Sequence, residues 1–377
     1  MRIALFCPSY GEVGGIETKV ASLTDRFHAD GHDVAVLARE RPGALPASNG
    51  VAVRRVPFHQ LPRRARHVVR ELRFLRDLPG ALAQLRRAAA AWRPDVVISL
   101  AITSYAPYSV ALGRVAPVLL GLESGGPSLT TRPWIMRWAL RRAARVVAVA
   151  TSVARAAAAV APDIGPRLTV IPNGVDPSRF SGSISFAHPR PYVLAVARLS
   201  REKGIDLLLD AFARLEVAHA GVDLLIAGDG PERTALLDQR ARLRLTERVH
   251  LLGNVGPDGI PPLYRGALLV ALPSRWEGLP LVALEAMASA RAVVATEVDG
   301  VPDAVHDDET GMLVPPEDPA ALADALARLI ADPDARQRLG DRGRAVAQAR
   351  FTWPVIAARY LELAGEVAAE RRAGQST

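Results

Sequence analysis

The sequence contains few cysteines and few lysines. The first scarcity excludes a class of fold, and the second draws attention to individual residues. Cys7 is the one cysteine among 377 residues, so no disulfide can form within the chain and a disulfide-stapled fold is excluded. Because Cys7 lies in the apolar run IALFC, we expect a reducing compartment and a cytoplasmic location. Lys19 and Lys203 are the two lysines among 47 cationic residues. Lysine offers a compact point charge where arginine offers a planar fork, so Lys203 is singled out for its chemistry.

Long apolar runs and aromatic residues are also scarce. No run reaches the roughly 18 apolar residues that span a bilayer, and the N-terminal apolar stretch is shorter than a signal-peptide core. We therefore expect neither a membrane-spanning segment nor an export signal. Aromatic residues make up 5% of the chain, whereas a nucleic-acid binder needs aromatic platforms among its basic residues. We expect no nucleic-acid partner.

Length and charge indicate two domains with different partners. A chain of 377 residues exceeds a single core of about 100 to 200 residues, and its 49% hydrophobic content fits a globular protein. Residues 1–180 carry 25 Lys or Arg against 12 Asp or Glu, a net charge of +13. Residues 181–377 carry 22 against 27, a net charge of −5. The basic half can attract phosphates, anionic lipid or nucleic acid, and charge alone does not choose among them.

Short runs rich in Val, Ile and Leu alternate with longer stretches of helical period, which predicts strand–helix–strand units around parallel sheets. The first half is expected to hold strands near 2–8, 33–38, 51–56, 95–100, 117–122, 145–149 and 168–171. The second half is expected to hold strands near 192–197, 222–227, 249–252, 268–272, 292–296 and 311–314. The fold class is therefore α/β, with two Rossmann-like, doubly wound parallel-sheet domains facing a cleft.

The expected domains are residues 1–178 and 190–350. The segment 173–191 between them is rich in Pro, Gly and Ser and predicts a hinge. An amphipathic helix at about 355–377 is expected to pack back on the first domain. Function is then expected in the loops that follow the strands, because open parallel sheets bind ligands at the carboxyl ends of their strands.

The loop after the first strand, SYGEVGGIETK (9–19), places Gly14 and Gly15 before a helix, whose N-terminal N–H groups attract anions. These glycines are adjacent, unlike the G-x-G-x-x-G fingerprint, so a nicotinamide enzyme is disfavoured. A plain tight turn is an equal alternative to an anion site.

A second loop, VARLSREKGID (196–206), places Arg198 and Lys203 on one rim. Two cations separated by a turn can converge on a diphosphate and offset the charge that grows on a leaving group. The equal alternative is a solvated loop whose cations pair with Glu202 or Asp206.

A third loop, within LLIAGDGPERTALL (224–237), ends a strand at Gly228, Asp229 and Gly230 and opens a helix at Pro231. The glycines allow a ligand to approach the backbone. Asp229 either contacts that ligand or holds the turn as a cap.

The segment LPSRWEGLPLVALEAMA (272–288) joins two glutamates to a helix N-terminus. Glu277 falls in the loop, Gly278 and Leu279 offer N–H groups beside it, and Glu285 lies two turns into the helix. Carboxylates accept hydrogen bonds from vicinal hydroxyls and a helix N-terminus binds phosphate, so the segment suits a sugar and a nucleotide phosphate. A glycosidase pair is disfavoured because Glu285 sits behind the phosphate-binding end. Two unrelated surface or capping glutamates are the other interpretation.

Together these motifs resemble family 4 of the retaining glycosyltransferases. The match consists of GGIE (14–17), ARLSREKG (197–204), AGDGPE (227–232) and EGLPLVALE (277–285) in this order, with IPNGVD (171–176) as a further match. The resemblance covers nearly the whole chain. It implies the GT-B fold, with a nucleoside diphosphate sugar mainly on the second domain and the acceptor on the first. It also implies no catalytic metal and no cofactor beyond that co-substrate, and retention of the anomeric configuration through same-face attack assisted by the leaving phosphate.

The resemblance also assigns roles to residues. Arg198 and Lys203 would hold the donor diphosphate, Glu277 the sugar hydroxyls and Glu285 the ribose, while Gly15 would offer its N–H near the phosphate. The donor-binding set is completed by Gly14, Gly228, Asp229, Gly278 and Leu279.

One position departs from the family pattern. Many relatives carry a histidine after the fifth strand, where LLGLESGG (119–126) offers Glu123. Glu123 orients the sugar and acceptor, replaces the role of the histidine, or caps a helix. We count it among the candidate catalytic residues.

The sequence has no motif for metal binding, for serine hydrolase chemistry or for nucleoside triphosphate hydrolysis. His28 and His32 are four residues apart, but Gly31 ends the helix that would align them and no cysteine partner exists, so we expect no metal site. The chain has no G-x-S-x-G elbow and no Walker loop, which disfavours hydrolase and NTPase functions.

The segment LPRRARHVVRELRFLRDL (61–78) alternates an apolar stripe with the arginines Arg63, Arg66, Arg70 and Arg73, as an interfacial helix does. The alternative is a solvated helix on a basic scaffold. The interfacial interpretation predicts contact with an anionic membrane surface, a lipid or lipid-linked glycan acceptor, and a peripheral location at the inner face of the cell membrane.

Two rivals share the fold: a nucleotide-sugar epimerase, and a non-catalytic protein that binds sugar nucleotides. An epimerase needs no acceptor, and a silent relative would be expected to lose one of the donor residues, all of which are present. The sequence therefore predicts a hexosyl-type glycosyltransferase of cell-envelope or glycan biosynthesis, acting on an acceptor hydroxyl.

Overall fold

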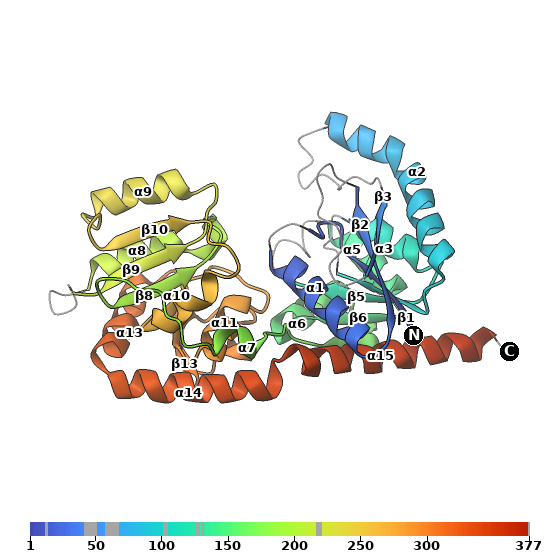
Figure 1. The fold of residues 1–377 in the computed structure, drawn as a ribbon. Coiled ribbons are helices and arrows are strands. Elements are labelled where there is room, and N and C mark those ends of the chain that lie inside the picture. The colour runs from blue at the N-terminus through green and yellow to red at the C-terminus, as the bar shows by residue number, and fades with distance from the viewer. Residues whose placement is uncertain are drawn as a thin grey trace. The chain divides into compact units, whose positions relative to one another are not determined.

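The computed structural model describes residues 1–11, 14–40, 51–56, 68–100, 105–124, 129, 132–215 and 221–375, without the side chains of residues 68–73 and 375. The chain divides into two compact units. The first combines Met1–Pro172 with Trp353–Thr377, and the second is Asn173–Thr352. Each unit is built on its own parallel sheet (Figure 1).

The first unit holds a seven-stranded parallel sheet of order β3-β2-β1-β4-β5-β6-β7. Its strands are β1 (Arg2–Phe6), β2 (Asp33–Arg39), β3 (Ala52–Val56), β4 (Val96–Ser99), β5 (Val118–Leu122), β6 (Arg145–Ala148) and β7 (Leu168–Val170). Its helices are α1 (Gly15–Ala29), α2 (Val68–Trp92), α3 (Ala106–Leu112), α5 (Pro133–Arg142), α6 (Thr151–Val160), the 3-10 helix η2 (Pro162–Arg167) and α15 (Trp353–Gln375). Strands such as β4 and β5 are buried throughout, because helices cover both faces of a doubly wound sheet.

The second unit holds a six-stranded parallel sheet of order β10-β9-β8-β11-β12-β13. Its strands are β8 (Tyr192–Val196), β9 (Asp223–Ala227), β10 (Val249–Gly253), β11 (Leu269–Leu272), β12 (Ala292–Thr296) and β13 (Gly311–Val314). Its helices are α7 (Pro177–Phe180), the 3-10 helix η3 (Arg201–Lys203), α8 (Ile205–Ala213), α9 (Arg233–Arg242), α10 (Ile260–Gly266), α11 (Leu281–Ala288), α12 (Val301–Ala304), α13 (Pro319–Ala331) and α14 (Pro333–Arg350).

The last helix, α15, belongs to the core of the first unit although it follows the whole of the second. Trp353, Ile356, Tyr360 and Val367 on α15 are buried in the same hydrophobic cluster as Ile3 of β1. Figure 1 shows this helix in red along the blue N-terminal elements. The chain therefore enters the second unit after Pro172 and returns at Trp353.

The predicted strands are confirmed, each within two residues at either end. The α/β class and the two Rossmann-like sheets are confirmed as well. Among the described residues, no helix is both long and apolar enough to cross a bilayer.

Candidate active site

The candidate donor residues of the second unit follow three neighbouring strands. β8 lies between β9 and β11, so the loops that leave these three strands emerge side by side at the carboxyl edge. The strand order reverses direction between β8 and β11, and such switch points are where open α/β sheets bind ligands.

Two glycines allow these loops to pack closely. Gly204, the residue before α8, has φ of +62°, and a Cβ there would lie 1.9 Å from the carbonyl oxygen of Pro273. Gly228 has φ of +135°, and a Cβ would lie 1.9 Å from the carbonyl oxygen of Ala197. Neither position tolerates a side chain, because both the backbone conformation and the space exclude it. Because these two glycines have no side chain, the loop after β8 can pack directly against the loops after β9 and β11.

Lys203 and Glu277 form the centre of the site. The Lys203 Nζ lies 2.6 Å from Glu277 Oε1, and the Ser274 hydroxyl donates to the same oxygen at 2.7 Å. The backbone N–H of Glu277 donates to Asp299 Oδ2 at 2.9 Å, which fixes the loop from the other side. Glu277 is 8% exposed and the Lys203 side chain 27%, so the pair is accessible from the ammonium side. The structure thus places a cation and a carboxylate together at the strand ends.

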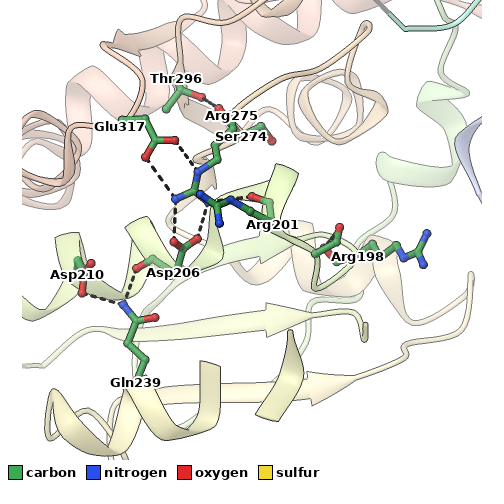
Figure 2. A network of polar contacts seen from close by, with 10 residues as sticks. Arg198, Arg201, Asp206, Asp210, Gln239, Ser274, Arg275, Thr296 and Glu317 are labelled. Atoms are coloured by element: carbon green, nitrogen blue, oxygen red, sulfur yellow. Dashed lines mark hydrogen bonds and ion pairs between the residues drawn. The ribbon is translucent and has the colours of Figure 1, made fainter. Parts of the chain in front are cut away.

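Arg275 holds this loop to the loop after β8, and sequence reasoning missed it. Its guanidinium contacts both oxygens of Asp206, at 2.7 and 2.8 Å, and also binds Glu317 and the carbonyl of Arg201 (Figure 2). The Asp206 carboxylate raises the pKa of Arg275 above its usual value. Burial raises the pKa of Asp206, but the hydrogen bonds and charge of Arg275 outweigh it and leave that pKa lowered. Arg275 therefore fixes the spacing between the cationic loop and Glu277.

Arg198 occupies the same loop as Lys203, and its carbonyl accepts a hydrogen bond from the Ser200 N–H at 2.9 Å. Its side chain is exposed, and in Figure 2 its guanidinium points away from Asp206 and Arg275. Lys203 forms its ion pair with Glu277. The predicted alternative partner Glu202 is influenced as well: burial raises its pKa, but the Ser200 hydrogen bond and the charges of Lys203 and Arg198 leave that pKa lowered. The Arg198 side chain is therefore left at the surface of this loop.

Glu285 lies in α11, where its carboxylate accepts a hydrogen bond from the buried Tyr264 hydroxyl at 2.8 Å. Burial raises the pKa of Glu285 to about 7, against the lowering effects of the Tyr264 hydrogen bond and of the Arg179 charge. The pKa of the Tyr264 hydroxyl is raised by burial and by that carboxylate. Glu285 is therefore a poorly solvated carboxyl for which a hydroxyl donor is a favourable partner.

The remaining donor candidates are backbone positions and a turn. Asp229 accepts a hydrogen bond from the N–H of Gly230 at 2.7 Å, so it holds the turn. Leu279 is buried, and its carbonyl accepts a hydrogen bond from the Asn173 side chain at 2.8 Å. Gly278 and Leu279 precede Pro280, the N-cap of α11, and their N–H groups thus lie just outside the helix.

In the first unit, Gly14 is the N-cap of α1 and Gly15 is its first residue. Gly14 is in extended conformation, and the Thr18 N–H donates to its carbonyl at 3.0 Å. The Gly15 N–H is therefore at a helix N-terminus, as an anion contact would require. Both glycines stand at the carboxyl end of β1.

Glu123 follows β5 and forms a buried ion pair with Lys19 of α1, the second residue that sequence reasoning missed. The Lys19 Nζ lies 3.0 Å from each carboxylate oxygen of Glu123, and it stands 5.5 Å from the centre of the Tyr360 ring. Lys19 is fully buried, and burial lowers its pKa, but Glu123 and Tyr360 outweigh this and leave it raised. The scarcity of lysine was the signal that could have pointed to Lys19 as well as to Lys203.

Comparison with known proteins matches one family model to each half of the chain. The family described as Glycosyltransferase Family 4 matches residues 13–179, and the family Glycosyl transferases group 1 matches residues 179–346. A phosphatidyl-myo-inositol mannosyltransferase of Mycobacterium leprae is 30% identical over 388 residues, which span 98% of this chain and 97% of that protein. The chain belongs to glycosyltransferase family 4. This glycosyltransferase is thus an enzyme of the transferase class.

Other relatives match a shorter part of the chain or have a lower sequence identity. Glycogen synthase of Mycobacterium tuberculosis is 29% identical over 95% of this chain and 92% of its own length. The alpha-D-kanosaminyltransferase of Streptomyces kanamyceticus is 37% identical, but the match spans 43% of this chain and 42% of that enzyme. The chain therefore matches less than half the length of that relative.

Solved structures share the fold of this glycosyltransferase. Sucrose-phosphate synthase from Thermosynechococcus elongatus has a TM-score of 0.83 and 24% identity, covering 98% of this chain and 99% of that one. Anabaena HepE, solved in complex with UDP-glucose, has a TM-score of 0.78 and 22% identity, covering 97% and 100%. At these identities the likeness shows the fold, which is the GT-B arrangement of two Rossmann-like units.

Proposed function

We propose that this glycosyltransferase moves a sugar from a nucleoside diphosphate sugar to an acceptor hydroxyl with retention of the anomeric configuration and without a catalytic metal. The observation that carries the proposal is the Lys203–Glu277 pair, 2.6 Å apart at the carboxyl edge of the second sheet. One member suits phosphate and the other suits sugar hydroxyls. A donor that lies across this pair would be held at both ends of its reactive bond.

The roles follow from charge and position. Lys203 and Arg198 would neutralise the diphosphate as the bond to the sugar breaks and negative charge grows on the leaving oxygen. Glu277 would accept hydrogen bonds from vicinal sugar hydroxyls, with Ser274 orienting its carboxylate. Glu285 would accept from the ribose, and the N–H groups near Gly15 and Gly278 would face phosphate oxygens. The acceptor hydroxyl would attack from the face that the leaving phosphate vacates, and that phosphate would receive its proton.

Glu123 is proposed to orient the acceptor from the first unit. A carboxylate has about four lone-pair sites, and Lys19 uses one on each oxygen. The remaining lone pairs of Glu123, which is 7% exposed, would accept from a substrate hydroxyl. Lys19 would then act as a positioning residue.

For the acceptor we propose a lipid, a lipid-linked sugar or an anionic glycan, met by a cytoplasmic enzyme at an anionic membrane surface. Arg63 and Arg66 lie outside the described residues, and Arg70 and Arg73 fall on α2, where their side chains are not described. The described end of α2 supports the proposal, because a cavity of about 630 Å³ there is rich in cationic side chains. Its arginines are Arg86, Arg87, Arg93, Arg114, Arg371 and Arg372. Relatives named for inositol-phosphate and phosphatidyl-inositol acceptors are consistent with an anionic acceptor.

The test is a thermal-shift screen against a panel of UDP-, GDP-, ADP- and dTDP-sugars. A ligand that binds the native state raises the melting temperature by mass action. We expect one donor to stabilise the protein and Lys203→Ala to remove most of that response. Arg201→Ala is the matched control, since Arg201 is an exposed cation of the same 3-10 helix. A panel without any response, or an undiminished response in Lys203→Ala, would contradict the proposal.

A further inference from the structure

Three potential metal ligands meet at the amino-terminal edge of the second sheet, at the opposite ends of the strands from the donor residues. The His188 Nε2 lies 2.7 Å from Asp223 Oδ2, and the His250 Nε2 lies 3.2 Å from the same oxygen. The three ligand atoms all lie within 4.8 Å of one another. Sequence spacing did not indicate this cluster, because His188 and His250 are 35 and 27 residues from Asp223.

The backbone fixes these side chains at the edge. Asp223 is the first residue of β9 and pairs with Tyr192 of β8, and its N–H donates to the Pro191 carbonyl at 2.9 Å. His250 is the second residue of β10, the next strand in the sheet. The His188 ring packs edge-on against His250, with 5.3 Å between ring centres. The cluster is therefore built by three adjacent chain segments of one unit.

Asp223 is held in a ligating orientation. It is 2% exposed, and a buried carboxylate requires compensating partners. Arg190 Nε stands 3.2 Å from Oδ1, the oxygen that accepts no hydrogen bond, and Arg190 is itself anchored on the Glu247 carbonyl at 2.8 Å. This leaves Oδ2 directed at both imidazoles. Arg190 acts on Oδ1 through its charge, at the position of the outer partners that orient metal-binding carboxylates.

We propose that His188, Asp223 and His250 bind a divalent transition metal of the zinc type, with a water as the fourth ligand. With metal–ligand bonds of about 2.0 to 2.2 Å, neighbouring ligand atoms of a tetrahedral site lie roughly 3.3 Å apart. The His250–Asp223 distance of 3.2 Å already fits, and the 2.7 Å between His188 and Asp223 has to open by about 0.6 Å. The ligand atoms of the two histidines lie within 4.8 Å of each other and have to approach by up to about 1.5 Å. Each imidazole coordinates through Nε2 while its proton resides on Nδ1. The His250 side chain is 36% exposed, which leaves an entry path.

The ligand chemistry selects the metal. Imidazole nitrogens favour Zn²⁺, Co²⁺, Ni²⁺ and Cu²⁺, whereas Mg²⁺ and Ca²⁺ prefer an all-oxygen shell. Arg190 and Arg248 add positive charge near Asp223. This charge further disfavours an ion such as Mg²⁺, which would be held by electrostatic attraction alone. The site is therefore expected to bind zinc in preference to magnesium.

The proposed metal lies far from the donor residues. β9 has five residues, so about 16 Å of strand separate Asp223 from the Gly228–Asp229 turn at the donor edge. A metal here would tie the segment before β8, through His188, to β9 and β10. It takes no part in sugar transfer, and the inference does not depend on the proposed function.

The experiment uses untagged, full-length protein stripped with EDTA and dialysed. We expect equilibrium dialysis with ZnCl₂ to give about one zinc per chain, and zinc, but not MgCl₂, to raise the melting temperature. His188→Ala and His250→Ala should each lose the zinc-dependent rise, and far-ultraviolet circular dichroism checks that they fold. His306→Ala, a partly exposed histidine of the same unit outside the cluster, should keep it. Equal responses to zinc and magnesium, no zinc bound by wild type, or full stoichiometry in the double variant His188→Ala/His250→Ala would overturn the proposal.

Discussion

The Lys203 ammonium and the Glu277 carboxylate, 74 residues apart in sequence, are bonded to each other at 2.6 Å across two loops of the second unit. Each group neutralises the other in the absence of ligand. A sugar nucleotide would exchange this internal contact for one between Lys203 and phosphate and another between Glu277 and sugar. The two side chains are thus held in place before the donor arrives, which lowers the entropic cost of ordering them.

Replacement of Lys203 tests the leaving-group role. We expect Lys203→Ala to lower kcat by about 10²- to 10³-fold, since loss of one charge-stabilising donor costs about 3 to 4 kcal/mol. Steady-state kinetics with the donor found in the thermal-shift screen measures the effect, with Arg201→Ala as the control. A rate within threefold of wild type would remove Lys203 from the mechanism.

Arg275 should set the geometry of the loops rather than contact the substrate. Its side chain is 10% exposed, whereas Asp206 and Glu317 are 43% and 58% exposed, so solvent weakens each pair. We expect Arg275→Ala to destabilise the second unit by about 1 to 2 kcal/mol and to raise KM for the donor more than it lowers kcat. Denaturant titration and kinetics measure both. Arg328→Ala, which breaks an exposed pair with Asp308, is expected to change neither.

Glu285 should make stability depend on pH. Burial raises its pKa from the ordinary 4.5 to about 7 in the folded state. Between these values the folded state binds more protons than the unfolded state, so the contribution of Glu285 makes stability fall as pH rises from about 4.5 to 7 and then level off. We expect Glu285→Gln to lose this slope and to gain stability relative to wild type at pH 8.

Urea titrations at four pH values from 5 to 8 provide the measurement. Glu309→Gln, at an exposed carboxylate, is the matched control and should follow the wild-type curve. Parallel curves for wild type and Glu285→Gln would show that the carboxyl is solvated.

The Lys19–Glu123 pair allows stability to be separated from catalysis. Glu123→Leu leaves the fully buried ammonium of Lys19 without its counter-ion, at an expected cost of about 3 to 5 kcal/mol. The double variant Lys19→Met/Glu123→Leu should recover most of that stability, because replacing both members of a buried pair is often neutral. We expect it to remain inactive in transfer if Glu123 orients the acceptor. A stable and fully active double variant would make the pair purely structural.

Membrane contact is tested by charge reversal in the basic segment 61–78. We expect binding to vesicles rich in anionic lipid to fall with added salt and to fall further in Arg66→Glu/Arg70→Glu. Arg338→Glu/Arg342→Glu, with the same spacing on α14 of the second unit, keeps the change in net charge and should bind as wild type. Co-sedimentation measures both, and unchanged binding of the first variant would end the interfacial interpretation.

The sequence was most informative where the signal is local. Strands such as Tyr192–Val196 and Asp223–Ala227 were predicted from short runs rich in Val, Ile and Leu, because burial on both faces of a parallel sheet requires such runs. The loops carrying Lys203 and Glu277 followed from the same rule, since parallel strands end at one edge. Their roles in binding remain predictions.

Contacts between distant segments could not be predicted. Lys19 and Glu123 are 104 residues apart, and Arg275 meets Asp206 across 69 residues. No periodicity or spacing in the sequence predicts such tertiary contacts, because they depend on how the helices and loops pack on the sheet. For the same reason the sequence did not predict the approach of His188 and His250 to Asp223, although Asp223 and His250 lie within predicted strands and His188 lies shortly before one.

The late return of the chain to the first unit has a consequence for biogenesis. Tyr360 and its neighbours on α15 complete a core that begins at Ile3, and they emerge from the ribosome after all of residues 173–352. The second unit can therefore mature while the first still awaits its final helix, which inverts the usual N-to-C order of co-translational folding. A nascent chain that stalls before Trp353 would leave exposed the apolar surface that α15 covers in the complete protein. We expect chaperones to bind the chain at this stage more than at any other.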